Sequence, residues 1–415
     1  MIIEFRVANY LSIKDEQILS FAASSEHELE ETHTIKLDKY KIKILRTAAI
    51  FGPNASGKTN MLKAINFMKN FIINSAKNKP GETTYAVPFK FTDGKYNILT
   101  KFEATFLLDD DIMYTYGFKL DEKKVYEEWL FYYPKKYKKT LFTRKNMEYK
   151  FSSDFRGENK SISKMTRENS LFLSAAADKN NKIAMSVYGW FMNNIFNFNQ
   201  TDIISNALFH KNILDYYKKQ NTKNEVIKLL NNADLNITDF TIKSKKLGEE
   251  FAPLLNFLTG QGITINNNKE AIDFNNETID ELIFKHDYNG ISAELKEMEE
   301  SNGTQKLFYI LPVFIDFKGI ILIDEIESSM HPYVINSLLD YFYKNNIATQ
   351  LIFTSHNTDL LNTELFRRDE IWFTEKETSG NTIIFSLNDI KPKPRLDDNI
   401  KMRYLYGKYG AIPNI

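Results

Sequence analysis

The segment 52–59, Gly-Pro-Asn-Ala-Ser-Gly-Lys-Thr, constrains the fold of this chain more than any other. It fits the phosphate-loop pattern, in which two glycines enclose four residues and are followed by Lys and Thr. The apolar run 47–51 predicts a buried strand before the loop, and the apolar spacing of 60–73 predicts a helix after it. A strand, a glycine-rich loop and a helix in this order direct backbone N–H groups and the positive end of the helix toward a phosphate chain.

A nucleoside triphosphate with Mg²⁺ is the ligand that this loop predicts. We expect Lys58 to reach the terminal phosphates and Thr59 to hold the metal ion. The predicted nucleotide-binding residues are Gly52, Pro53, Asn54, Ala55, Ser56, Gly57, Lys58, Thr59 and Asn60.

A second apolar run, 319–323, ends in Asp324 and Glu325. A strand in the middle of a parallel sheet is buried on both faces and is therefore continuously apolar, and open α/β sheets bind ligands at the carboxyl ends of such strands. We expect Asp324 to hold Mg²⁺, directly or through water, and Glu325 to orient or deprotonate an attacking water. An edge strand followed by a solvated acidic turn has the same composition, and the phosphate loop favours the functional interpretation.

Two further segments indicate which subclass of phosphate-loop protein the chain resembles. The run 351–355 predicts another buried strand, and His356 follows it. Upstream of the acidic pair, Ser301 and Gly303 stand at a predicted helix start, where a hydroxyl and N–H groups can contact a phosphate. Ser-x-Gly is equally an ordinary helix cap, so both interpretations of Ser301 stay open.

Together these segments resemble the ABC-type ATPase heads of SMC, Rad50 and RecF, and more closely the stand-alone ATPases of the OLD and RloA type from bacterial anti-phage and abortive-infection systems. The resemblance rests on 2–12, 51–60, 300–308, 320–332, 354–361 and 403–413. It implies that His356 contacts the terminal phosphate, and that Ser301 and Gly303 complete the ATP site of a second subunit. The partner would be a second copy, in a homodimer or a higher even assembly. The Gln that ABC heads carry in the loop after their first helix has no assigned equivalent here.

The fold class that the resemblance implies is α/β: an ABC-type P-loop ATPase head, with a mixed sheet and an antiparallel β-subdomain. An inserted, mainly helical arm is expected within it. The alternation of apolar residues over 101–107 and 112–118 predicts a hairpin of the β-subdomain. The predicted domains are 1–175 and 291–415 for the two parts of the head and 176–290 for the arm. No heptad run suggests a long coiled coil, and the Asn-rich stretch 266–268 predicts a loop.

Composition argues against several classes of protein. The formal net charge is zero, with 54 basic and 54 acidic residues, which does not favour a protein that binds polyanions with its whole surface. Without Cys, the chain has neither a disulfide framework nor a thiolate metal site. The first residues do not resemble a signal peptide, and no apolar run is long enough to cross a bilayer. We expect a cytoplasmic protein without a membrane partner.

One basic and aromatic stretch is a candidate for binding nucleic acid. It comprises Lys135, Lys136, Tyr137, Lys138 and Lys139, with Tyr132 and Tyr133 before it and Arg144 and Lys145 after it. Clustered Lys with interleaved Tyr can bind a phosphate backbone and stack on bases. A solvated hairpin tip that discourages edge-to-edge pairing has the same pattern and is the favoured interpretation, with nucleic-acid binding as the alternative.

The function that follows is an ATP-hydrolysing dimeric switch or sensor in an anti-phage system. OLD nucleases carry a Toprim nuclease domain after the ATPase, and the residues after His356 are too few for one. The resemblance therefore implies a separately encoded effector, such as a nuclease or toxin. The alternatives are a DNA-repair ATPase of the RecF or SMC kind that binds DNA directly, and a nucleotide-binding scaffold with little turnover. The sequence does not distinguish ATP from GTP.

Overall fold

The computed structural model describes residues 1–92, 98–198, 207–219, 222–233, 235–246, 278–395 and 398–412. Two compact units make up the chain. The first comprises Met1–Phe198, Phe317–Glu327 and Leu339–Ile415, and the second comprises Asn199–Asp316 and Ser328–Leu338. The stretch 266–268, predicted to be a loop, lies outside the described residues.

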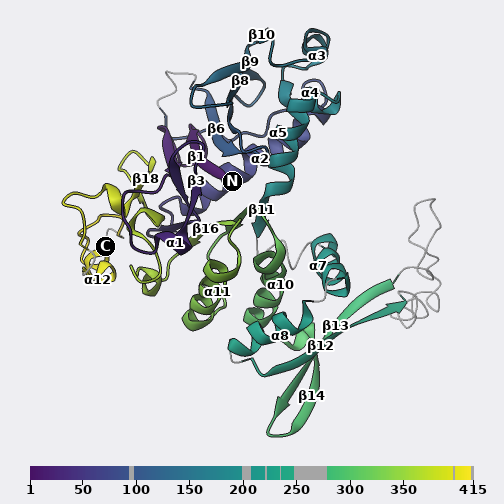
Figure 1. The fold of residues 1–415 in the computed structure, drawn as a ribbon, viewed down its shortest axis with the longest axis vertical. Helices are drawn as coiled ribbons and strands as arrows, with labels where there is room; N and C mark the ends of the chain where they lie inside the picture. The colour runs from purple at the N-terminus through teal and green to yellow at the C-terminus, as the bar shows by residue number, and fades with distance from the viewer. Residues whose placement is uncertain are drawn as a thin grey trace. The chain divides into compact units, whose positions relative to one another are not determined.

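A six-stranded sheet in the first unit carries the strands that the motifs predict (Figure 1). Its order is β11 (Ile195–Phe198), β15 (Ile320–Ile323), β16 (Gln350–Ser355), β5 (Thr47–Phe51), β17 (Ile371–Lys376) and β18 (Thr382–Ser386). All neighbours are parallel except β18, which pairs antiparallel with β17. Every residue of β5, β15 and β16 is buried, which confirms them as central strands. Their carboxyl ends therefore meet at one edge of the sheet.

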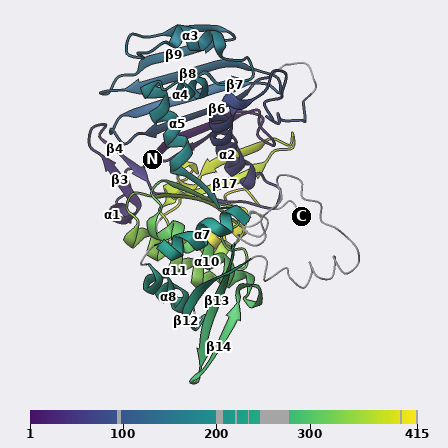
Figure 2. The same ribbon diagram turned by 90° about the vertical axis from the view of Figure 1, so that its right-hand side faces the viewer.

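The second sheet of the first unit is antiparallel and has seven strands (Figure 2). Its order is β10 (Glu148–Phe151), β9 (Lys139–Lys145), β8 (Val125–Tyr133), β7 (Met113–Leu120), β6 (Thr100–Leu107), β1 (Ile2–Ala8) and β2 (Gln17–Ser20). Along β6 every second residue is fully buried, because side chains alternate between the two faces of a strand. The β6–β7 pairing confirms the predicted hairpin.

Helix α2 (Lys58–Asn74) joins the two sheets into one core. Its Phe67 and Phe71 rings contact Phe102 and Phe118 of the antiparallel sheet, and the helix also packs on β16. Helices α3 (Asn159–Met165), α4 (Phe172–Asp178) and α5 (Lys182–Asn194) follow the antiparallel strands. Trp190 of α5 stacks on Phe106, with ring centroids 4.2 Å apart. The order of strands around β5 and the added antiparallel sheet confirm the predicted fold class, an ABC-type P-loop ATPase head.

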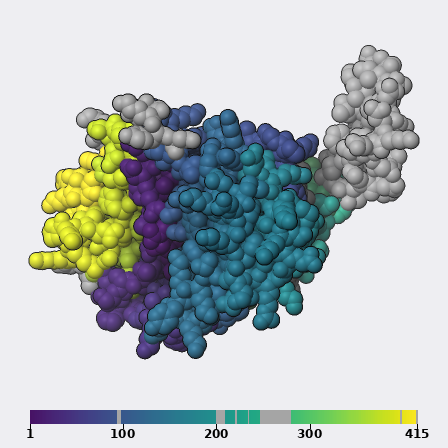
Figure 3. Space-filling view, turned by 90° about the horizontal axis from the view of Figure 1, so that it is seen from above, coloured from purple at the N-terminus to yellow at the C-terminus, as the bar shows by residue number. Residues whose placement is uncertain are grey.

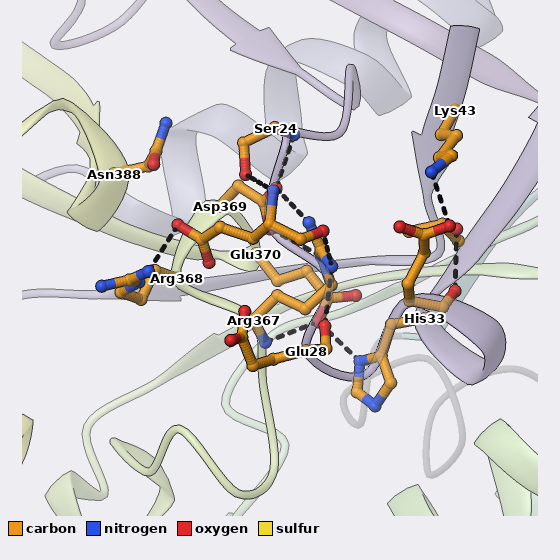
Figure 4. A network of polar contacts seen from close by, with 12 residues as sticks. Ser24, Glu28, His33, Lys43, Arg367, Arg368, Asp369, Glu370 and Asn388 are labelled. Atoms are coloured by element: carbon orange, nitrogen blue, oxygen red, sulfur yellow. Dashed lines mark hydrogen bonds and ion pairs between the residues drawn. The ribbon is translucent and has the colours of Figure 1, made fainter. Parts of the chain in front are cut away.

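A buried polar network fastens the start of β17 to the N-terminal region (Figure 4). Arg367 forms an ion pair with Asp369 at 2.9 Å, and Asp369 accepts from the backbone N–H of Ser24. Glu370 is fully buried 2.7 Å from Nδ1 of His33, a residue of α1 (Glu30–His33). Burial raises the pKa of Glu370, and His33 opposes this shift. The hairpin of β3 (Thr34–Leu37) and β4 (Ile42–Leu45) is thereby tied to the sheet that carries the loop.

The second unit contains α7 (Ala207–Lys219), α8 (Lys223–Asn232) and α10 (Asn302–Asp316), together with a three-stranded antiparallel sheet. That sheet is β12 (Ile237–Lys246), β13 (Thr278–Tyr288) and β14 (Ile291–Lys296). Phe240 and Phe284 of the sheet pack edge-on against Phe308 of α10. The arm is thus helical only in part, because apolar residues in β12 and β13 alternate and cover the helices with one face.

The boundaries of the two units differ from the predicted domain boundaries, because packing decides to which unit a helix belongs. Helix α5 lies in the predicted arm, 176–290, but packs into the core of the first unit through Trp190. Helix α11 (Pro332–Asn345) begins in the second unit and ends in the first. Among the described residues the longest helix is α2, with 17 residues, so they contain no long coiled coil. None of the described helices is long and apolar enough to cross a membrane.

Candidate nucleotide-binding site

The loop between β5 and α2 needs both of its glycines. Gly52 has φ +152°, and a Cβ there would lie 2.5 Å from the carbonyl oxygen of Thr374. Gly57 has φ +110°, and a Cβ there would lie 2.3 Å from the Thr382 hydroxyl. Strands β17 and β18 therefore approach the loop so closely that a side chain at either position would displace them.

Hydroxyl groups from distant segments fix the shape of the loop. The Ser56 hydroxyl lies 2.6 Å from that of Thr374, and the Thr382 hydroxyl donates to the Ser56 carbonyl at 2.8 Å. Ser12 lies 2.8 Å from Thr382 and accepts from the Asn60 side chain at 2.7 Å. On the surface in Figure 3, the N-terminal region (purple) accordingly lies against segments near the C-terminus (yellow-green). Sequence reasoning assigned no role to Thr374 or Thr382, because no local motif marks them.

Lys58 is buried inside the loop. Its Nζ donates to the carbonyl oxygens of Gly52 at 2.6 Å and Pro53 at 2.9 Å, and it lies 3.2 Å from Nδ1 of His356. Burial lowers the pKa of Lys58 to about 8, although nearby carboxylates, led by Glu327, favour its charged form. The ammonium is therefore held at the phosphate loop in a poorly solvated place, where an anion would interact with it strongly.

Asp324 lies directly opposite the start of α2. Its Oδ1 accepts hydrogen bonds from the hydroxyls of Thr59, at 3.0 Å, and Thr354, at 2.6 Å. Mg²⁺ prefers oxygen ligands of this kind, with one or two carboxylates and the substrate phosphates around it. The two residues predicted to hold the metal thus lie within hydrogen-bond distance and fit it. The sequence did not reveal this role of Thr354, which is the last residue but one of β16.

Glu325 and His356 also lie together at this edge. The Glu325 carboxylate is 3.4 Å from Nε2 of His356, and the Glu325 backbone N–H donates to the Thr354 hydroxyl at 2.8 Å. Glu325 has φ +49°, an unusual conformation for a residue with a side chain, and such backbone often occurs at functional sites. The carboxylate of Glu327 accepts from the backbone N–H groups of His356 and Asn357. It therefore positions His356, a role that the sequence did not reveal.

Ser301 and Gly303 belong to the second unit. Ser301 caps α10, since its hydroxyl accepts from the N–H of Thr304 at 3.1 Å. A Cβ on Gly303 would lie 2.3 Å from the carbonyl oxygen of Ser329, in the loop after the acidic pair. Lys306 donates to the neighbouring Ser328 carbonyl at 3.1 Å. Ser301 is thus an ordinary N-cap of α10. That Ser301 and Gly303 also contact the nucleotide of a second subunit stays a prediction.

The basic stretch is partly neutralised. Arg144 is buried, 3.5 Å from the buried Glu128, and so does not reach solvent. Lys139 lies 3.7 Å from Asp154, and Lys138 lies over the Phe131 ring. Lys135, Lys136, Tyr137 and Lys145 are exposed, and the choice between a nucleic-acid site and a solvated hairpin tip stays a prediction.

One family model and several solved structures are similar to this chain. A family model described as "AAA domain, putative AbiEii toxin, Type IV TA system" matches residues 48–362. No curated protein sequence matches the chain. An SMC head domain from Thermotoga maritima is 12% identical, with a TM-score of 0.41 over 93% of this chain and 98% of that one. An Smc head domain bound to the C-terminal domain of ScpA, derived from Pyrococcus furiosus, is 13% identical, with a TM-score of 0.41 over 93% and 96% of the two chains.

Proposed function

Because the chain belongs to this AAA domain family, whose description names an AbiEii toxin and a type IV toxin–antitoxin system, we propose that it is an ATP-hydrolysing switch of a bacterial anti-phage system. It acts as a dimer and controls a separately encoded effector. One observation carries the ATPase part. At the edge where β5, β15 and β16 end, Lys58 contacts His356, His356 contacts Glu325, and Thr59 contacts Asp324.

Each of these residues has a chemical task in hydrolysis. Lys58 binds the β- and γ-phosphates, and Thr59 and Asp324 hold Mg²⁺, which neutralises and orients the phosphate oxygens. Glu325 takes a proton from the water that attacks the γ-phosphorus, while the bond from that phosphorus to the leaving ADP oxygen breaks. His356, 3.4 Å from Glu325, holds this carboxylate and contacts the terminal phosphate. The products are ADP and phosphate.

The switch rests on a second copy of the chain. Ser301 and Gly303, at the start of α10, present a hydroxyl and backbone N–H groups to the nucleotide of the partner. ATP then joins two subunits, and hydrolysis releases them, which makes the γ-phosphate the signal that selects between two states. This arrangement is supported by the family resemblance of 300–308 and by the tight fit of Gly303 on the loop that follows Glu325.

An efficiency-of-plating assay tests the biological role. Cells receive the ATPase alone, a neighbouring gene alone, both, or both with Glu325→Gln. Glu364→Gln, at an exposed glutamate in the same unit, is the matched control. We expect protection from phage only with both genes, its loss with Glu325→Gln, and its retention with Glu364→Gln. Full protection by the ATPase alone, or unchanged protection with Glu325→Gln, would reject the mechanism.

The family's description favours one second candidate, in which the chain itself is the toxic component. Induced expression of this chain alone separates the two. Growth arrest that is relieved by a neighbouring gene supports the toxin, whereas normal growth supports a switch that needs an effector. Sensitivity to DNA damage without a phage phenotype would instead support the DNA-repair ATPase.

A further inference from the structure

An almost fully exposed methionine lies three residues before Ser301, in the second unit. Met298 is the middle residue of a short 3-10 helix, Glu297–Glu299, and is 92% exposed. Gln305 of α10 holds the backbone of this turn, because its side chain donates to the carbonyls of Glu297 at 2.8 Å and Glu300 at 3.2 Å. The methionine is therefore presented to solvent from a fixed backbone, which reduces the entropy lost when another surface covers it.

The residues around Met298 are mostly acidic. The stretch 294–300 contains four Glu and one Lys. The carboxylates of Glu297 and Glu300 contact histidine rings of the second unit. Glu299 is exposed, and its carboxylate accepts from a backbone N–H of the same turn at 2.7 Å. The turn thus presents an apolar side chain beside a negative charge.

An apolar stripe lies in the first unit, on α12 (Ile400–Leu405), and ends just after this helix (Figure 1). Met402, Leu405 and Tyr406 are 41%, 51% and 73% exposed. Their spacing of i, i+3 and i+4 puts side chains on one face of a helix. The segment 400–412 contains no acid and three cations, Lys401, Arg403 and Lys408. The stripe is therefore opposite in charge to the turn around Met298.

Packing fixes α12 and leaves one of its nearby cations to solvent. On the other face of the helix, the Tyr404 ring stacks on Phe373 of β17, with centroids 5.3 Å apart. Lys401 and Arg403 pair with aspartates of the same unit. Lys408 is exposed, and a carboxylate from outside can reach it.

A cavity of about 630 Å³ lies between this stripe and the phosphate loop. The outer side of the loop, 52–56, and His356 line one side, and Leu405 and Ile412 line the other. His356 places the cavity at the end of the loop where the terminal phosphate is expected. The cavity is large enough to admit an apolar side chain. One acid and one cation also line it, Glu375 and Lys376.

We propose that a second copy of the chain inserts its Met298 into this cavity when its Ser301 contacts the nucleotide on the loop, an inference that rests on the proposed dimer. Three residues of extended chain span at most about 10 Å, so Met298 can reach the cavity while Ser301 lies at the terminal phosphate. Met298 packs on Leu405, and Glu299 pairs with Lys408. In a two-fold dimer this contact forms twice, once beside each nucleotide.

Cross-linking tests the contact directly, because the chain contains no Cys. Met298→Cys and Leu405→Cys are made separately in the Glu325→Gln background, given tags of different mass, mixed and treated with a short bismaleimide. We expect a mixed cross-linked dimer with ATP and much less of it with ADP. Met192→Cys, at an exposed methionine of the first unit, replaces Leu405→Cys as the control and should give no mixed product. Dimers that form with ATP but give no mixed product would overturn the inference.

Sedimentation with ATP gives a second measurement in the same background. Met298→Asp and Leu405→Asp place a charge in an apolar contact and should raise the Kd of the dimer at least about 10-fold. Met192→Asp should leave this Kd unchanged. Each variant should keep the ATP affinity of the isolated subunit, which also shows that it is folded.

Charge reversal tests the ion pair. Glu299→Lys and Lys408→Glu should each weaken the dimer by roughly 3-fold, and the variant that carries both should recover, because the pair is restored with its charges exchanged. An ATP-dependent dimer that Met298→Asp and Leu405→Asp leave intact would overturn the inference and leave the proposed function standing. Absence of any ATP-dependent dimer in Glu325→Gln would overturn both.

Discussion

The hydroxyl of Thr59, at the start of α2, donates to the carboxylate of Asp324, at the end of β15, over 3.0 Å. The two residues are 265 positions apart in the chain. Parallel pairing of β5 with β16 and of β16 with β15 brings them to the same edge. The contact joins the two oxygens that we assign to Mg²⁺, and it makes the metal dependence of nucleotide binding a direct test of the site.

Thr59→Val should make ATP binding nearly independent of Mg²⁺. The substitution keeps the size of the side chain but removes the hydroxyl ligand, and Mg²⁺ in proteins depends on few protein ligands. We expect ATP affinity in Mg²⁺ to fall to the value measured in EDTA. Titrations with and without the metal measure this, and Thr378→Val, at an exposed threonine, is the control. A Thr59→Val variant with full metal dependence would remove Thr59 from the site.

Nucleotide binding should weaken as the pH rises through about 8, the pKa to which burial lowers Lys58. Below this pH the ammonium is charged and binds phosphate, whereas above it the free protein has lost the proton. Since a bound triphosphate favours the charged form, binding near pH 8 to 9 should take up a proton. Calorimetry in two buffers of different ionisation enthalpy measures the uptake. Lys58→Ala should abolish both the uptake and the binding, and equal ATP affinity in this variant would disprove the phosphate-loop assignment.

The effect of Lys58 on the free energy of unfolding has a pH dependence opposite to its effect on nucleotide binding. Its pKa is lower in the folded chain than the usual 10.5, so the unfolded chain binds more protons between about pH 8 and 10.5. This residue therefore makes the free energy of unfolding rise with pH across that window. Lys58→Met should reduce the slope, which denaturant titrations at pH 8, 9 and 10 would reveal.

Glu325→Gln should bind ATP and hydrolyse it about 10²- to 10⁴-fold more slowly, the usual contribution of a general base. The amide keeps the shape of the side chain but cannot take a proton. The variant should accumulate as an ATP-dependent dimer, which sedimentation measures with ATP and with ADP. Unchanged turnover would show that another residue activates the water.

Ser301→Arg should abolish hydrolysis while the isolated subunit still binds ATP. If Ser301 acts in the partner's site, mixing this variant with Lys58→Ala creates one composite site that lacks both groups and one that keeps both. Partial recovery of ATPase activity on mixing is the expected result. Heterodimers that form but stay inactive would leave Ser301 as a cap of α10 alone.

Arg46 should be a strong stability determinant. This buried residue directly precedes β5 and donates to the carbonyls of Phe342 at 2.9 Å and Tyr343 at 3.0 Å, near the end of α11. Arg46→Met removes both of these hydrogen bonds from a charged donor and should lower the free energy of unfolding by about 3 kcal/mol. Denaturant unfolding measures this. Lys344→Met, at an exposed cation of the same helix, should change it by less than about 1 kcal/mol.

The sequence alone determined the phosphate loop, the strands that end at it and the acids at Asp324 and Glu325. These are local features: the loop pattern is eight consecutive residues, and strands buried on both faces are continuously apolar. The alternation in β6 and β7 equally predicted a hairpin, because its period of two is visible in any strand with one buried face.

Only the tertiary structure decided which distant groups complete the site. Hydroxyl groups of Ser12, Thr374 and Thr382 fix the shape of the loop. The Thr354 hydroxyl donates to the Asp324 carboxylate, which also accepts from Thr59. Glu327 positions His356 by accepting from its backbone N–H. The tertiary structure also buried Arg144 against Glu128, although the next residue, Lys145, is exposed. The sequence around a Ser, Thr or Arg looks the same whether its side chain faces water or a partner from a distant part of the chain. Its role is therefore fixed by the pairing of strands, which no short stretch of sequence encodes.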